Sequence, residues 1–133
     1  MYVDTAFRPG GFNGNRIRTI LVVDDEETIR MVVSDYLLDF GYAVIEAENA
    51  ARAREILRTR PVDLVLSDVD MPGGENGFGL EKWIRAEYPD VRVILTSGYP
   101  QGAEKLRDLA EPLIVKPYSL EMVEKRIERS LGA

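Results

Sequence analysis

The sequence predicts an α/β fold in which five parallel strands form one doubly wound sheet with helices on both faces, (βα)5. Short apolar runs with little alternation recur along the chain, and such runs are typical of parallel strands that are buried on both faces. Stretches with the i, i+3, i+4, i+7 spacing of one helix face lie between them. Right-handed crossovers then join the units into a single sheet. The predicted strands are Ile20–Val23, Ala43–Ala47, Val62–Ser67, Val91–Thr96 and Leu113–Val115.

The predicted helices are marked by their caps and stops. The apolar positions from Ile29 to Phe40 share one helix face, and Gly41 ends that helix. Asn49 is the predicted N-cap of the second helix, which stops before Pro61. The other three helices are predicted around Leu80–Ile84 with a stop at Pro89, over the short and weakly patterned stretch Ala103–Ala110, and from a Ser119 cap to Leu131.

The length and composition of the chain predict one folded domain. With 133 residues, 45% of them hydrophobic and 30% charged, the chain can bury one continuous core and is too short for two ordinary domains. Residues 1–18 combine glycines and asparagines with no apolar period, which predicts a flexible N-terminal leader. The folded domain is therefore expected over residues 19–131.

Charge and residue counts argue against several classes of function. A formal net charge of -6 without a clustered basic stretch argues against direct nucleic-acid binding. The chain has no cysteine and no apolar run long enough for a membrane helix or a signal peptide, so we expect a cytoplasmic protein without membrane insertion. It also has no histidine, so any phosphohistidine must come from outside this chain.

Acidic residues follow two of the predicted strands. Asp24 and Asp25 come directly after the first strand, and Asp68 comes directly after the third. If these strands are neighbours, three carboxylates meet at one edge of the sheet, where like charges about 4 Å apart repel by about 4 kcal/mol per pair at an effective dielectric of about 20. A cation must offset this repulsion, and all-oxygen ligands favour a hard ion such as Mg²⁺.

The fourth and fifth predicted strands end in groups that can stabilise an oxyanion. Ser97 supplies a hydroxyl donor, and the following Gly98 has no side chain to block an approaching group. Lys116, which precedes Pro117, supplies an ammonium group opposite the carboxylates. Together these residues predict a ring of stabilising groups around one carboxylate nucleophile.

In these residues the sequence resembles the receiver domain of two-component response regulators, over about residues 18 to 131. The resemblance implies a flavodoxin-like arrangement of the sheet. It rests on four motifs that follow one another in the family's order at the strand ends: Asp24-Asp25, Asp68 with Met71-Pro72, Ser97-Gly98 and Lys116-Pro117.

The resemblance implies roles for the acidic residues first. Asp68 would be the phosphoacceptor, and Asp24 and Asp25 would hold Mg²⁺ together with it, one of the two through water. Asp70 would contribute its backbone carbonyl to the metal. The site would therefore bind one magnesium ion next to the residue that is phosphorylated.

The same resemblance implies roles for the groups opposite the acids. Ser97 would follow the phosphoryl group as the switch hydroxyl, and Lys116 would pair with that group. The bond between Lys116 and Pro117 is expected to be cis, as is typical of the family.

The implied function is that of a response regulator receiver in two-component, or phosphorelay, signal transduction. A sensor or hybrid histidine kinase, or a histidine phosphotransfer protein, would donate the phosphoryl group from phosphohistidine in the presence of Mg²⁺. Phosphorylation would then change the binding of a downstream protein target. Such a phosphoprotein is not an enzyme, since it catalyses only its own phosphotransfer and a slow autodephosphorylation.

Three features depart from the commonest form of the family. The loop 72–77 is one residue longer than usual before its final glycine. Leu113 stands where many members carry an aromatic side chain that moves with the switch hydroxyl. The stretch from Ser97 to Lys116 is a few residues short, which predicts a stunted or irregular fourth helix.

Three other functions fit the sequence less well. The segment Leu64–Asp70 also resembles haloacid-dehalogenase-like phosphatases, with Asp68 as nucleophile and Asp70 as general acid, but Met71 and Pro72 stand where that family wants Thr or Val. A flavin-binding module is disfavoured because the acidic loop after the first strand would repel a phosphate. A degenerate receiver that serves only as a docking module is disfavoured because all the expected site groups are present.

Overall fold

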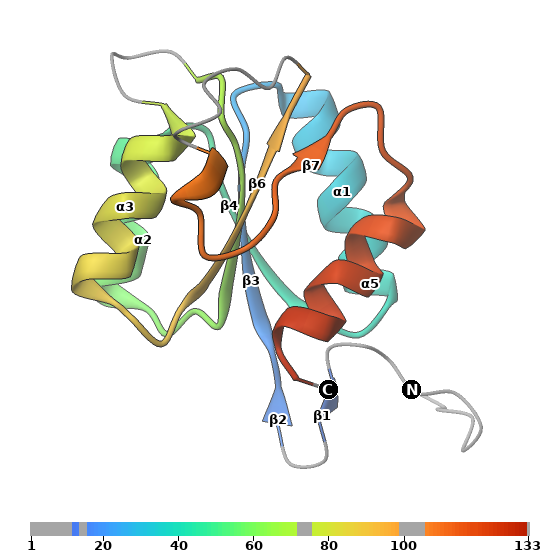
Figure 1. Cartoon of the computed structure of the whole chain (residues 1–133). Coiled ribbons are helices and arrows are strands. Elements are labelled where there is room, and N and C mark those ends of the chain that lie inside the picture. The colour runs from blue at the N-terminus through green and yellow to red at the C-terminus, as the bar shows by residue number, and fades with distance from the viewer. Residues whose placement is uncertain (1–11, 14–15, 72–75, 99–105, 133) are drawn as a thin grey trace.

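The computed structural model describes residues 12–13, 16–71, 76–98 and 106–132. Its main element is one sheet of five parallel strands in the order β4-β3-β5-β6-β7. In Figure 1 this sheet lies between the helices. The strand order reverses at β3, because β4 and β5 lie on either side of it. The strands are β3 (Thr19–Val23), β4 (Ala43–Ala47), β5 (Leu64–Asp68), β6 (Arg92–Ser97) and β7 (Ile114–Val115).

The prediction of five parallel strands is confirmed, and the strand ends differ from it by up to two residues. β5 begins at Leu64 and ends at Asp68, whereas the sequence predicts a strand from Val62 to Ser67. The strand extends to Asp68 because this residue pairs with Thr96 of the neighbouring strand β6. Hydrogen bonding between neighbouring strands determines where each strand ends, and a local apolar pattern in the sequence does not predict that pairing.

Within the described residues, four helices cover the sheet, two on each face. Figure 1 shows α1 and α5 together on one side of the sheet and α2 and α3 on the other. No helix in this part of the chain combines the length and the apolar character needed to cross a membrane. The helices are α1 (Glu27–Asp39), α2 (Ala50–Thr59), α3 (Gly77–Glu87) and α5 (Leu120–Ser130).

Side-chain caps fix where three of these helices begin. The side chains of Asn49, Asn76 and Ser119 each accept a hydrogen bond from a backbone N–H in the first turn of the helix that follows. The caps predicted at Asn49 and Ser119 are thus confirmed. After α1 the chain turns at Gly41, whose φ of 108° lies in the left-handed region that favours glycine.

The predicted fourth helix, Ala103–Ala110, lies partly outside the described residues, because residues 103–105 are not among them. Part of the loop 72–77 also lies outside the described residues, because residues 72–75 are not among them. The sequence predictions for these two segments therefore stay predictions.

The core consists of two apolar clusters, one on each face of the sheet. Side chains of α2 and α3 pack on one face and those of α1 and α5 on the other. Alternate residues of the central strands contribute to the two clusters: Leu21 and Val23 face one, Ile20 and Val22 the other. Every residue of β5 is buried. Continuous apolar runs in the sequence follow from this burial of strands on both faces.

Two very short strands precede the sheet, and the sequence does not predict them. β1 (Phe12–Asn13) and β2 (Arg16–Ile17) form an antiparallel pair within the predicted leader. The guanidinium of Arg16 makes two hydrogen bonds, 3.0 and 2.5 Å long, with the carboxylate of Asp63 just before β5. This contact links the leader to the amino end of the sheet. The predicted boundary between residues 1–18 and 19–131 itself stays a prediction.

Candidate functional site

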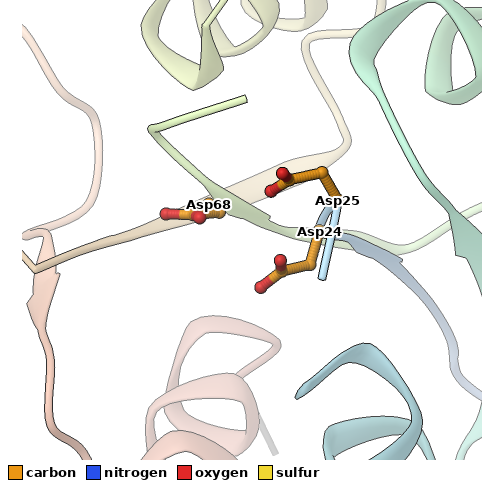
Figure 2. A group of neighbouring side chains, drawn as sticks. All are labelled: Asp24, Asp25 and Asp68. Carbon is orange, nitrogen blue, oxygen red and sulfur yellow. The ribbon is translucent and has the colours of Figure 1, made fainter. Parts of the chain in front are cut away.

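Three carboxylates meet at the carboxyl end of the sheet, at the point where strand order reverses. Asp24 and Asp25 follow β3 directly, and Asp68 is the last residue of the neighbouring strand β5. One carboxylate oxygen from each residue lies within 4.8 Å of those from the other two, and Figure 2 shows the three side chains gathered at these strand ends. The structure therefore brings together the acids that the sequence placed after the first and third strands.

Asp24 is held by three hydrogen bonds, one with β4 and two with residues at the start of α1. Its N–H donates to the carbonyl of Ala47 at the end of β4, at 3.1 Å. Its carboxylate accepts from the N–H of Glu26 at 2.9 Å, and its backbone carbonyl accepts from Nη1 of Arg30 in α1 at 2.7 Å. Asp24 is 5% exposed, whereas Asp25 is exposed to solvent. The pair therefore presents one buried and one exposed carboxylate.

Asp68 is 5% exposed and lies beneath the start of α3. A Cβ atom placed on Gly77, the first residue of α3, would lie 2.5 Å from the carbonyl oxygen of Asp68 and 2.9 Å from Cα of Val69. The N–H of Gly77 donates to the carbonyl of Val69 at 2.8 Å. The helix can approach the strand end this closely because glycine has no side chain.

Lys116 reaches the acidic cluster from the end of β7. Its Nζ lies 3.4 Å from Oδ2 of Asp68, and its N–H donates to the carbonyl of Ser97 at 2.9 Å. The bond between Lys116 and Pro117 is cis, as expected from the sequence. The sequence-predicted lysine and the sequence-predicted nucleophile thus form a direct ion pair.

The remaining predicted site residues lie at the same edge. Ser97 is the last residue of β6 and is 1% exposed. Asp70 is exposed, and its N–H lies 3.4 Å from Oδ1 of Asp68, which is a long hydrogen bond. Leu113 is half-buried and packs against the core cluster on the side of α2 and α3. The roles of these residues in the chemistry stay predictions.

Burial and charge shift the pKa values of the central groups. Burial raises the pKa of Asp24, and the hydrogen bond from Glu26, which by itself would lower it, only partly offsets this. Burial likewise raises the pKa of Asp68, and the charge of Lys116 only partly offsets this. Burial by itself would lower the pKa of Lys116, but the charges of Asp68 and Asp24 outweigh it and the pKa is raised. Burial thus opposes the ionisation of Asp24 and Asp68, Lys116 only partly offsets this at Asp68, and a further cation would stabilise the ionised forms.

Three residues shape the site without having been singled out for it from the sequence. Arg30 binds the backbone of Asp24, Gly77 allows α3 to approach Asp68, and Tyr118 lines a small recess with both of these aspartates. Burial raises the pKa of Tyr118. Only Gly77 had a signal in the sequence, as the final glycine of the loop 72–77. The other two come into place through packing between distant elements.

A groove of about 670 Å³ borders the site on the side of α1 and α5. Lys116 and Gly98 belong to its lining, so a molecule in the groove would also lie next to the acidic cluster. The other lining residues are mostly apolar: Thr28, Ile29, Val32, Val33, Pro117, Tyr118 and Leu120.

Comparison with known proteins agrees with this geometry. The family model of the response regulator receiver domain matches residues 20–128, which is most of the chain. This chain belongs to the receiver domains of response regulators. Receiver domains of this family interact with histidine kinases and with downstream targets. The findings give no support to the haloacid-dehalogenase-like alternative.

Curated relatives resemble this receiver domain over most of its length. The chain is 36% identical over 120 residues to the probable transcriptional regulator ycf27 of Porphyra purpurea, covering 88% of this chain and 49% of that protein. It is 34% identical over 102 residues to the response regulator protein FleR of Pseudomonas aeruginosa, covering 74% of this chain and 21% of that protein. The chain thus spans less than half the length of these relatives.

Solved structures share the fold. The signal receiver domain of an HD domain-containing protein from Pseudomonas fluorescens is 28% identical, with a TM-score of 0.81 over 88% of this chain and 96% of that one. The response regulator TrrA of Thermotoga maritima, solved in complex with Mg²⁺-BeF, is 28% identical, with a TM-score of 0.77 over 85% of this chain and 98% of that one. The predicted flavodoxin-like sheet is confirmed by these neighbours and by the strand order.

Proposed function

We propose that this receiver domain accepts a phosphoryl group on the carboxylate of Asp68 and thereby changes its binding to a partner protein. The observation that carries the proposal is the pairing of Asp68 with Lys116 at 3.4 Å, beside two further aspartates whose oxygens lie within 4.8 Å. A carboxylate nucleophile with a cation on one side and a candidate metal site on the other is the arrangement that phosphoryl transfer needs.

Mg²⁺ is the proposed cofactor, and the residues fit it. Three carboxylate oxygens so close together form the all-oxygen donor set that this hard ion prefers. Burial raises the pKa values of Asp24 and Asp68, and a bound cation would offset this cost of ionisation. Asp24, Asp25 and Asp68 would hold the ion, one of the first two through water, with the backbone carbonyl of Asp70. When bound, Mg²⁺ would neutralise negative charge on the transferring group.

The chain's own groups would carry out the transfer. An Asp68 carboxylate oxygen would form the new bond to phosphorus while the donor nitrogen of phosphohistidine leaves. Lys116 would bind an oxygen of the transferred group, and the hydroxyl of Ser97 would donate to it afterwards. Moving a two-state equilibrium from 1:99 to 99:1 takes about 5.5 kcal/mol, which a few charge-assisted hydrogen bonds can supply.

The proposal includes the partners and the type of activity. The donor would be a sensor or hybrid histidine kinase or a histidine phosphotransfer protein, because the chain contains no histidine of its own. The output would be a changed contact with a downstream protein, and the domain would be a phosphoacceptor and not an enzyme with turnover. We include a cytoplasmic location, because a chain without cysteine suits a reducing compartment.

Phosphorylation by a small-molecule donor tests the site. The protein is incubated with acetyl phosphate and Mg²⁺, and incorporation is measured by intact-mass spectrometry. We expect the wild type to gain one phosphoryl group and Asp68→Asn to gain none. Asp35→Asn, which removes an exposed carboxylate of α1, is the matched control and should label like the wild type. Equal labelling of Asp68→Asn and the wild type would refute the assignment of the site.

Replacement of Lys116 by alanine tests the coupling of phosphorylation to conformation. We expect Mg²⁺ binding to stay nearly intact while the change in hydrogen exchange of β6 and β7 on phosphorylation is lost. Lys82→Ala, at an exposed position of α3, is the control and should respond like the wild type. A full response of Lys116→Ala would remove this lysine from the mechanism.

A further inference from the structure

We propose that Arg30 is a positioning residue for the acidic pair Asp24-Asp25, and that its guanidinium sets the affinity of the site for Mg²⁺ without touching the ion. The inference rests on the proposed function, since it concerns the metal site proposed above. Two bonds made by a single side chain carry it, one to the backbone of Asp24 and one to Glu46 of β4.

Arg30 ties the first turn of α1 to two neighbouring segments. Its Nη1 donates to the carbonyl oxygen of Asp24 at 2.7 Å, and its Nε donates to Oε1 of Glu46 at 2.9 Å. The Arg30 side chain is 15% exposed, and it lines the small recess that Asp24 and Asp68 share. Both hydrogen bonds lie within normal N–H···O distances, so the guanidinium is fixed at two points.

The bond to the carbonyl of Asp24 acts on both metal-binding residues at once. This oxygen belongs to the planar peptide unit that joins Asp24 to Asp25, so a donor that holds it also fixes the orientation of that plane. Rotation of the plane would redirect both carboxylates. The other two hydrogen bonds of Asp24 involve different atoms. Its backbone N–H donates to Ala47, and its carboxylate accepts from the N–H of Glu26, whereas Arg30 binds the carbonyl oxygen.

The alternative role for Arg30 is purely electrostatic, and it predicts the opposite effect. A cation beside three carboxylates competes with Mg²⁺, so removal of its charge would strengthen metal binding. The charge of Arg30, however, is paired with Glu46 at 2.9 Å, which reduces its field at the cluster. Loss of position should therefore outweigh loss of charge, and removal of Arg30 should weaken metal binding.

Magnesium titration of four variants by calorimetry, without phosphodonor, distinguishes the two roles. We expect Arg30→Ala to bind Mg²⁺ at least about tenfold more weakly than the wild type, the usual cost of losing a group that orients a metal ligand. Arg30→Lys keeps the charge but replaces two separate donor nitrogens by a single one, and it should also bind more weakly. Glu46→Gln keeps an acceptor for Nε and should weaken Mg²⁺ binding less than Arg30→Ala does. The control Arg52→Ala removes an exposed arginine of α2 and should bind normally.

Hydrogen exchange supplies a readout that does not depend on metal. The N–H of Glu26 donates to the carboxylate of Asp24, so this amide should exchange faster in Arg30→Ala and Arg30→Lys than in the wild type. A urea melt checks that each variant is folded. If Arg30→Ala does not fold, Arg30→Lys decides the question.

The outcomes separate this inference from the proposed function. A wild type that does not bind Mg²⁺ contradicts the proposed metal site itself. A wild type that binds Mg²⁺, together with Arg30→Ala or Arg30→Lys variants that bind as tightly or more tightly, overturns the positioning role alone. Weaker binding in both variants with faster exchange at Glu26 supports it.

Discussion

An aspartate beside a basic side chain lies at each end of strand β5, Asp63 just before it and Asp68 as its last residue, and their pKa values are shifted in opposite directions. At the amino end, burial alone would raise the pKa of Asp63, but hydrogen bonds from Arg16 and from the N–H of Thr19 outweigh it and the pKa is lowered. At the carboxyl end, Asp68 pairs with Lys116 at 3.4 Å, and burial raises its pKa.

Burial raises the pKa of both carboxyls, and the difference lies in whether hydrogen bonds and nearby cations outweigh it. Asp63 accepts three bonds of 2.5 to 3.0 Å and stabilises the fold in its ionised form. Asp68 has a longer ion pair, a long bond from the N–H of Asp70 and two aspartates for neighbours. The first carboxylate is satisfied by the protein, whereas the second remains available for a ligand.

The largest effect is expected at the carboxyl end from Gly77→Ala. The added methyl group would lie 2.5 Å from the carbonyl of Asp68, and backbone atoms cannot move aside easily. We expect a loss of about 3 kcal/mol in the free energy of unfolding, measured by urea denaturation. Gly98→Ala is the control for stability, because no atom lies within 4 Å of its added Cβ. A Gly77→Ala protein as stable as the wild type would contradict the close approach of α3.

At the amino end, Asp63→Asn should destabilise the protein. The substitution replaces a charged acceptor by a neutral one at Arg16 and Thr19, and we expect a loss of about 1 to 2 kcal/mol. Most of this belongs to the bond from Thr19, since Arg16 is 61% exposed and its ion pair is screened by water. Thermal and urea melts measure the change, with the exposed Asp35→Asn as control. An Asp63→Asn protein as stable as the wild type would contradict the view that the hydrogen bonds to Asp63 stabilise the fold.

Asp24→Asn should have a smaller effect of the opposite sign. The asparagine retains an oxygen that accepts from the N–H of Glu26 and removes one charge from the cluster. In the absence of Mg²⁺ at neutral pH, we expect a gain of about 1 kcal/mol in the free energy of unfolding, allowing for screening by water. Addition of Mg²⁺ should stabilise the wild type more than the variant. A variant less stable than the wild type without metal would contradict the view that this charge costs stability.

The smallest expected effect is the pH dependence of these two stability differences. Asp24 has a raised pKa, so the wild type gains stability as the pH falls through that value, and the advantage of Asp24→Asn should shrink. Asp63 has a lowered pKa, so its stabilisation is present above its unfolded pKa and is lost as the pH falls through the folded one. Both differences should therefore close on acidification, that of Asp63 at the lower pH. Urea melts over a pH series, with metal removed, measure this order.

Much of the site could be predicted from the sequence because its residues follow the strands directly. Asp24 and Asp68 each come at the end of a continuous apolar run, and parallel strands bring their carboxyl ends to one edge. Lys116 could be placed for the same reason, since it follows the last strand. The cis bond to Pro117 came from the resemblance to a family.

The supporting residues could not be predicted, because their partners are far away in the chain. In the sequence Arg30 cannot be distinguished from other charged residues of the helix, because its partner Glu46 lies in β4 and comes close only in the folded protein. Arg16 and Asp63 are 47 residues apart and meet only when the amino end of the sheet has formed. A local sequence pattern does not predict contacts between residues so far apart in the chain.

The sequence alone determined the succession of strands and helices along the chain, because strands that are buried on both faces must be continuous apolar runs. It also determined the type of residue at each strand end, since the site lies where those runs stop. The tertiary structure decided which carboxylates have their hydrogen bonds satisfied by the protein and which remain available for a ligand. The physical reason is that a pKa depends on every hydrogen bond, charge and buried surface within a few ångströms, and only the packed sheet assembles those surroundings.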